Sequence, residues 1–135
     1  MSKSIYFTVF SAASLLLGGI IYILFRENTY IAGVFDYSWL EPVRNCISVL
    51  SCDFIKYYLP DFLWSLSLCG FLIAIFAPKL VGAIICGATA VLCGTLWEFL
   101  QCLGICSGTG DVFDIVMYLA AACVAVIISI KGKFK

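Results

Sequence analysis

The chain has 135 residues, of which 64% are hydrophobic and 12% charged, with a formal net charge of zero and a mean hydropathy of +1.12. An average soluble domain carries about 25% charged residues, so a water-soluble core of this size could not bury so much apolar surface. The balanced charge argues against nucleic acid as a partner, and the absence of His removes the commonest metal ligand and proton shuttle at neutral pH.

The apolar residues form four blocks of about 20 residues, the length that a hydrocarbon core roughly 30 Å thick requires. The first block follows Lys3 and has no small-residue cleavage site after it, so we interpret it as a retained helix rather than a signal peptide. Pro60 suits the first helical position of the second block, and the glycine-rich stretch 104–110 is a turn between the last two. The sequence therefore predicts a single all-α domain, a four-helix transmembrane bundle with spans at about residues 5–25, 60–77, 81–103 and 112–130.

The segment between the first two spans, about residues 26–59, is predicted to lie outside the hydrocarbon core. From Pro42 its apolar residues recur at intervals of three and four, which is typical of an amphipathic helix lying in the interface. The apolar positions are Val43, Ile47, Leu50 and Phe54, and the polar ones are Arg44, Asn45, Ser48, Ser51 and Lys56. Aromatic residues that suit headgroup depth flank this segment: Tyr30, Tyr37, Trp39, Tyr57 and Tyr58. The alternative is a loop packed over the bundle.

The distribution of Lys and Arg predicts the orientation. With four spans, both termini and the turn at residues 78–79 share one side, and that side holds Lys3, Lys79, Lys131, Lys133 and Lys135. The other side holds Arg26, Arg44 and Lys56 over a much longer stretch. The positive-inside rule therefore predicts that both termini are cytoplasmic and that the interfacial segment and the glycine-rich turn face outward.

This topology brings the acidic residues of three spans to one level near the outer surface. Glu98 precedes the glycine-rich turn by about five residues, so at about 1.5 Å per residue it lies roughly 8 Å below the end of its helix. A carboxylate at that depth usually faces a bundle interior or a wet cavity, so Glu98 is either functional or a protonated side chain bonded to a neighbouring helix. The predicted polar pocket comprises Asp61, Glu98, Gln101, Asp111 and Asp114.

Three of these acids also fit a simpler role. An Asp at the N-cap with an acid three residues later, as in Asp111 and Asp114, is typical of a helix start, and Asp61 after Pro60 is typical of a first turn. As a cluster, the acids could instead hold a divalent cation, act as acid and base on a lipid-borne substrate, or bind a cationic group. Cations predicted on the same side could neutralise the acids or contact an anion such as phosphate: Arg26, Arg44 and Lys56.

The eight cysteines do not form a metal-ligand pattern, and we expect neither a metal site nor a cofactor. Several lie inside apolar blocks, where Cys serves as a small hydrophobe: Cys69, Cys86, Cys93 and Cys123. The sequence leaves open the disulfide state of the cysteines predicted to lie outside the cell, which are Cys46, Cys52, Cys102 and Cys106.

Two stretches resemble the VanZ-like family of bacterial integral membrane proteins. One is Trp97-Glu98-Phe-Leu-Gln101 followed by Gly-Thr-Gly110-Asp111-Val-Phe-Asp114, and the other is Pro60-Asp61-Phe-Leu-Trp64-Ser65. The resemblance implies a bacterial plasma-membrane protein of four or five helices, in a family whose founding member contributes to teicoplanin resistance. Gly-Thr-Gly and Trp64 stand where that family often has a basic or aromatic residue and a His, which counts against chemistry that needs those side chains.

Three functions from different classes follow. The first is an envelope protein whose polar pocket binds a membrane lipid or a lipid-linked cell-wall precursor and affects glycopeptide (teicoplanin) susceptibility. The second is an enzyme acting on a lipid-linked substrate with Glu98 as acid or base, although no nucleophile with an adjacent base is evident. The third is a small assembly subunit of a membrane complex, or a homo-oligomer, in which small residues allow close helix packing: Gly18, Gly19, Gly82, Gly87 and Gly94.

Overall fold

A computed structural model describes residues 2–25, 38–48, 52–76, 79–106 and 108–132. In chain order its elements are α1 (Lys3–Phe25), the 3₁₀ turn η1 (Ser38–Leu40), α2 (Glu41–Ser48), the π turn η2 (Phe54–Tyr58), α3 (Leu59–Phe76), α4 (Leu80–Cys102) and α5 (Val112–Lys131). The described ranges contain no strand, so the fold is all-α, as predicted.

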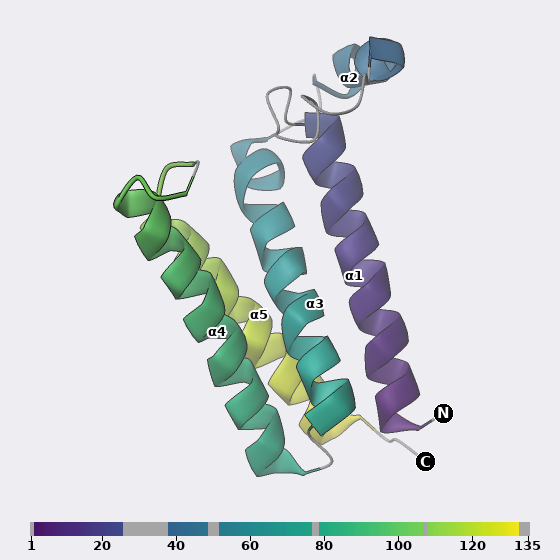
Figure 1. The fold of residues 1–135 in the computed structure, drawn as a ribbon. Coiled ribbons are helices and arrows are strands. Elements are labelled where there is room, and N and C mark those ends of the chain that lie inside the picture. Colours follow the sequence, from purple (N-terminus) through teal and green to yellow (C-terminus); the bar gives the residue numbers. More distant parts are fainter. Residues whose placement is uncertain (1, 26–37, 49–51, 77–78, 107, 133–135) are drawn as a thin grey trace.

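Within the part of the chain that the structure describes, four helical segments are long and apolar enough to cross a membrane: Lys3–Phe25, Phe54–Phe76, Leu80–Cys102 and Val112–Lys131. They stand side by side as a bundle (Figure 1). Large apolar side chains point outward from them, and Leu16 and Leu92 are 66% and 68% exposed. In water such exposure would be unfavourable, whereas in a bilayer these side chains contact lipid tails. The predicted four-helix transmembrane bundle is confirmed, and the arrangement is that of a multi-pass membrane protein.

Helix α3 is the centre of the bundle. It packs against α1 on one side and against α4 and α5 on the other, and α4 and α5 also pack against each other. The interior combines a few large side chains, such as Phe7 and Ile73, with small ones that let the helix backbones approach closely, among them Ala83, Ala121 and Ala125. This arrangement leaves the start of α3, the end of α4 and the start of α5 next to one another.

The helix that carries the second span begins at Phe54, before the predicted start of the span at Pro60, because the π turn runs directly into α3. The Leu59 N–H donates to the Phe54 carbonyl oxygen, the bond to the fifth preceding residue that defines a π turn. In a regular α-helix the ring of Pro60 would clash with the carbonyl group four residues earlier. The wider turn just before Pro60 lets the helix continue through this position, so residues 54–59 are continuous with the helix that carries the second span.

The predicted amphipathic segment contributes to two elements, α2 and η2, while residues 49–51 lie outside the described part of the chain. Arg44, predicted on the polar face, is only 9% exposed. Its Nη2 donates to the carbonyl oxygen of Ile23 at 2.8 Å, and its Nη1 lies 3.4 Å from Glu41 Oε1. Because the last carbonyl groups of a helix have no partner within it, Arg44 caps the C-terminal end of α1.

We expect Arg44→Ala to loosen α2 from α1 while leaving the four spans intact, because the loss of a hydrogen bond from a charged donor costs about 1.5–3 kcal/mol. Limited proteolysis in detergent micelles should then cut faster near α2, at an unchanged melting temperature. Glu41→Gln is the matched control, since Glu41 is 57% exposed and exposed ion pairs contribute about 0–1 kcal/mol. Equal cleavage rates in the two variants would contradict the capping role.

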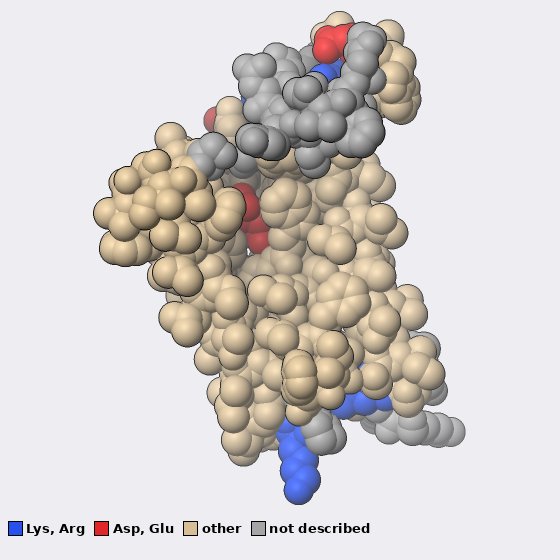
Figure 2. All heavy atoms as spheres, in the orientation of Figure 1, with Lys and Arg blue, Asp and Glu red and all other residues tan. Residues whose placement is uncertain are grey.

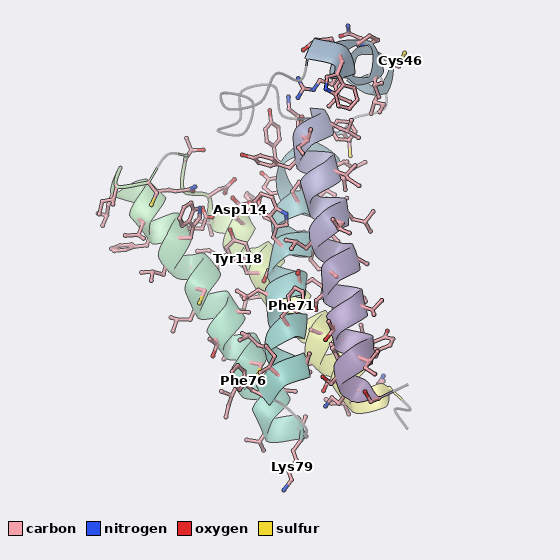
Figure 3. The ribbon with its side chains drawn as sticks, turned by 45° about the vertical axis from the view of Figure 1, so that its right-hand side comes forward. Cys46, Phe71, Phe76, Lys79, Asp114 and Tyr118 are labelled. Carbon is pink, nitrogen blue, oxygen red and sulfur yellow. The ribbon has the colours of Figure 1, made fainter. Side chains whose placement is uncertain are left out.

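Helix α1 starts, and α5 ends, at the end of the bundle that also carries Lys79 (Figures 1 and 3). Figure 2 shows Lys and Arg side chains projecting from that end and acidic side chains recessed in the opposite half of the molecule. Arg26, Lys133 and Lys135 lie outside the described residues. The structure therefore separates Lys3, Lys79 and Lys131 from the acids by most of the height of the bundle.

Candidate functional site

Glu98 is a carboxylate buried at the junction of α4 and α5. It lies in the last turns of α4 and is only 4% exposed. Its Oε1 accepts a hydrogen bond from the Tyr118 hydroxyl at 2.7 Å, and its Oε2 accepts one from the Asp111 backbone N–H at 3.0 Å. Burying an ionisable group in apolar surroundings is costly unless it is hydrogen-bonded, and both of these donors come from α5 or its cap. Glu98 therefore holds the end of α4 against the start of α5.

Asp111 connects three segments of the chain. As the N-cap of α5, it accepts a hydrogen bond on Oδ1 from the Phe113 N–H at 2.9 Å. Its Oδ2 lies 3.4 Å from the hydroxyl of Tyr58 in η2, while its own N–H donates to Glu98. The capping role that the sequence suggested is present, and the same residue also links α5 to the second span and to α4.

Tyr118 is a site residue that the sequence analysis did not single out. Its side chain is 6% exposed, and its ring packs so closely on Gly94 of α4 that a Cβ at this glycine would lie 2.7 Å from ring atom Cε2. Its hydroxyl is within electrostatic reach of Asp61 and Asp114 as well as Glu98. One signal could have found it: Tyr118 follows Asp114 by four residues, so the two share a face of α5, and they lie one above the other in Figure 3.

The structure brings together four of the five residues of the predicted pocket. Two tyrosine hydroxyls lie among their carboxyl groups. Tyr58 is within electrostatic reach of Asp111 and Asp114, and Tyr118 is within electrostatic reach of Asp61, Glu98 and Asp114. We call this set the acidic cluster: Asp61, Glu98, Asp111 and Asp114, with Tyr58 and Tyr118. In Figure 2, acidic side chains are visible in a hollow between α4 and α3.

Gln101, the fifth residue of the predicted pocket, lies under the glycine-rich turn. Its amide group is in contact with the Cα side of Gly108, leaving no room for a Cβ there. Gly108 also has a φ of +132°, a conformation that side chains rarely adopt, so this position requires glycine on both counts. The role of Gln101 is therefore to support the turn that carries Asp111 to Glu98.

The cations predicted to contact an anion are placed differently. Arg44 lies against the end of α1 and against Glu41, and the Nζ of Lys56 lies 5.2 Å from the centre of the Tyr57 ring. Arg26 is outside the described residues. The contacts that Arg44 and Lys56 make in the described part of the chain are thus outside the acidic cluster.

The geometry of the acidic cluster does not fit a metal ion closely. Within residues 2–25, 38–48, 52–76, 79–106 and 108–132, no three His, Cys, Asp or Glu side chains converge tightly enough to hold one. The carboxyl groups are instead spread around two hydroxyl groups. A divalent cation needs several short bonds to oxygen atoms that converge on one point. This spread of carboxyl groups instead suits a larger group that is held by several hydrogen bonds.

An apolar groove of about 600 Å³ runs between α4 and α5, within the size range of about 300–1,000 Å³ that is usual for small-molecule sites. Ala88 and Leu92 line it from α4, and Ile127 lines it from α5. At one end it reaches Thr95, one turn before Glu98, and Leu119, the residue after Tyr118. The groove therefore ends at the depth of the buried carboxylate.

Comparison of the chain with protein-family models, with curated proteins and with solved structures found no match. The resemblance to the VanZ-like family rests on the two quoted stretches, and the acids of both stretches meet in the acidic cluster.

Proposed function

We propose that this chain is a VanZ-like protein of the bacterial plasma membrane that binds a membrane lipid or a lipid-linked cell-wall precursor at the acidic cluster and so affects susceptibility to glycopeptides such as teicoplanin. The observation that carries the proposal is the burial of Glu98 in a helix that can span a membrane, with three further carboxyl groups close by. Ionisable residues inside a membrane are expensive and usually serve function.

The proposed orientation puts the acidic cluster in the outer half of the bilayer. Lys3, Lys79 and Lys131 lie at the opposite end of the bundle, and the positive-inside rule assigns that end to the cytoplasm. A binding site at this depth is therefore accessible to an outer-leaflet lipid.

Binding is favoured over catalysis by the state of Glu98. A general acid or base exchanges a proton with the substrate through a side-chain atom within hydrogen-bond reach of it. Both oxygens of Glu98 accept hydrogen bonds from the protein itself, and the residue is almost fully buried. In this arrangement Glu98 organises the site, while the less buried Asp61 and Asp114 face the ligand.

A role as an assembly subunit is disfavoured by the positions of three of the five glycines predicted to pack against a partner. Gly18 packs against Trp64, and Gly94 packs against Tyr118, both within the chain. Gly87 likewise lies against the side chains of α5. These close approaches stabilise the bundle itself, so the three glycines are not available for packing against a partner helix.

Glu98→Gln tests the proposal. Gln keeps the shape of the side chain: its carbonyl oxygen can accept from the Asp111 N–H, and its amide can donate to the Tyr118 oxygen, so the protein should reach the membrane in normal amounts. We expect expression of the wild-type chain in a susceptible bacterial host to raise the minimum inhibitory concentration of teicoplanin. We expect Glu98→Gln to abolish most of the increase, because it replaces a hydrogen-bond acceptor of the acidic cluster with a donor while the fold is kept.

Glu41→Gln is the matched control for this experiment, because it makes the same chemical change at an exposed acid outside the acidic cluster. It should retain the wild-type effect on susceptibility. A wild-type chain without any effect on teicoplanin susceptibility would refute the glycopeptide part of the proposal. An effect that survives Glu98→Gln would remove the acidic cluster from it.

A further inference from the structure

Ser65 on α3 carries a buried hydroxyl that has no hydrogen-bond partner. The residue is 7% exposed, and its Oγ neither donates nor accepts a hydrogen bond. A serine in a helix can usually satisfy its hydroxyl by donating to the carbonyl oxygen four residues earlier, as Ser14 does to Phe10. Ser65 does not do so, and a buried hydroxyl left without a partner is unfavourable. Its hydroxyl is therefore available to a group that is not part of the chain.

The helical register directs Ser65 toward the acidic cluster. Leu63 faces Gly18 of α1, and a residue two positions further along a helix with 3.6 residues per turn is rotated by about 200°. Ser65 therefore faces away from α1, toward α4 and α5. It shares this face with Asp61, one turn closer to the outer end of α3, and Asp61 is within electrostatic reach of Tyr118. The free hydroxyl thus lies directly below the carboxyl groups of the acidic cluster.

We propose that the acidic cluster binds the primary ammonium group of an aminophospholipid of the phosphatidylethanolamine type. This inference rests on the proposed function, since it names the lipid that the same site would take. A primary ammonium group has three N–H donors and no acceptor, so it needs only acceptors around it. Asp61 and Asp114 offer carboxylate oxygens from two helices, and Ser65 offers a hydroxyl oxygen below them.

The same acceptors discriminate against other headgroups. A headgroup that presents only phosphate or pyrophosphate groups has no N–H to donate, and the carboxylates would repel it. A quaternary ammonium group carries positive charge but no N–H, so it cannot donate to Ser65 or to the carboxylates. A metal ion would need three converging ligands of a kind that the described residues do not bring together. Charge complementarity combined with hydrogen bonding therefore selects a primary amine.

The hollow between α3 and α4 accounts for the lipid chain. The acidic cluster lies in helices that can span a membrane, and acidic side chains are visible in this hollow from the surface of the bundle (Figure 2). An outer-leaflet lipid whose ammonium group enters the hollow extends its acyl chains along the apolar outer surface of the bundle. These chains supply the second contact that distinguishes a lipid from a free amine.

Lipid exchange followed by native mass spectrometry tests the inference. The purified full chain is equilibrated with equal amounts of phosphatidylethanolamine, phosphatidylcholine and phosphatidylglycerol in detergent, and the lipid retained on the protein is counted. We expect the wild-type chain to prefer phosphatidylethanolamine. Hydrogen bonds to charged groups contribute strongly to binding affinity, so Ser65→Ala and Asp61→Asn should each reduce the preference for phosphatidylethanolamine by about tenfold.

Ser129→Ala is the matched control, because Ser129 is another buried serine without a partner but lies near the opposite end of α5. It should leave the lipid preference unchanged. Soluble phosphoethanolamine tests the contribution of the acyl chains: competition at equal concentration would overturn the acyl-chain contact, and failure to compete would support it.

The outcomes for the lipid and for the proposed function are separable. Equal retention of the three lipids by the wild-type chain, or an unchanged preference in both Ser65→Ala and Asp61→Asn, would overturn the ammonium inference. If teicoplanin susceptibility still depended on Glu98 in that case, the proposed function would stand with a different ligand. A clear preference for phosphatidylethanolamine without any effect on susceptibility would support the lipid site and refute the proposed effect on glycopeptide susceptibility.

Discussion

Gly94→Ala should weaken the contact between α4 and α5 strongly, although it adds a single methyl group. The new Cβ would meet the Tyr118 ring, and the ring cannot move away without breaking the 2.7 Å hydrogen bond to Glu98. Overpacking in a well-packed interior costs about 1–3 kcal/mol, and loss of the hydrogen bond to a charged group would add about 1.5–3 kcal/mol. Unfolding by SDS in mixed micelles, followed by tryptophan fluorescence, measures the difference in stability.

Gly19→Ala is the control for this prediction. The change is chemically identical and also lies within a spanning helix, but no atom outside the helix backbone lies within 4 Å of the added Cβ. We expect Gly19→Ala to be neutral or to stabilise the chain by about 0.4–1 kcal/mol through reduced freedom of the unfolded state. Equal stability of the two variants would contradict close packing of Tyr118 on Gly94.

Glu98→Leu should destabilise the bundle more than Glu98→Gln does, even though Leu is the more apolar side chain. Both changes remove the carboxylate, whose presence in the membrane costs a few kcal/mol. Gln can keep a hydrogen bond to each group, accepting from the Asp111 N–H and donating to the Tyr118 oxygen, whereas Leu leaves both groups without a partner, at about 1–3 kcal/mol for each buried group. The difference between the two variants, measured by the same unfolding assay, therefore isolates the hydrogen bonds.

A double-mutant cycle identifies the pair responsible. Tyr118→Phe removes one donor, and we expect the combination of Glu98→Leu and Tyr118→Phe to cost less than the sum of the two single changes by about 1 kcal/mol. Strictly additive losses would show that the hydroxyl and the carboxylate do not interact. The equivalent cycle with Tyr58→Phe should be nearly additive, because Tyr58 contacts Asp111 and not Glu98.

The number of spans and the depth of the acids could be predicted because both depend only on the chain order of apolar blocks. Once α3 and α5 begin, and α4 ends, on the same side, Asp61, Glu98 and Asp111 must share a level. The start of the helix that carries the second span could not be predicted. Pro60 is typical of a first helical position, and the π turn before it has no sequence signature.

The rotation of each helix about its axis could not be predicted from the sequence. That rotation puts Gln101 under the glycine-rich turn and points Glu98 at Tyr118, twenty residues away on another helix. Tyr118 sits in an apolar block where an aromatic residue attracts no notice. Arg44 was assigned to a polar face from the periodicity of its own segment, whereas its burial is decided by the end of α1, which no local pattern reveals.

The position of Glu98 in the chain also constrains how the protein is made. Both groups that donate to its carboxylate, the Asp111 N–H and the Tyr118 hydroxyl, lie C-terminal to it. During translation α4 therefore leaves the ribosome before either donor does, and its carboxylate has no partner from α5 in hydrocarbon until α5 arrives. We therefore expect stable membrane insertion of α4 to be coupled to that of α5, with the two helices entering the bilayer as a hairpin rather than in succession.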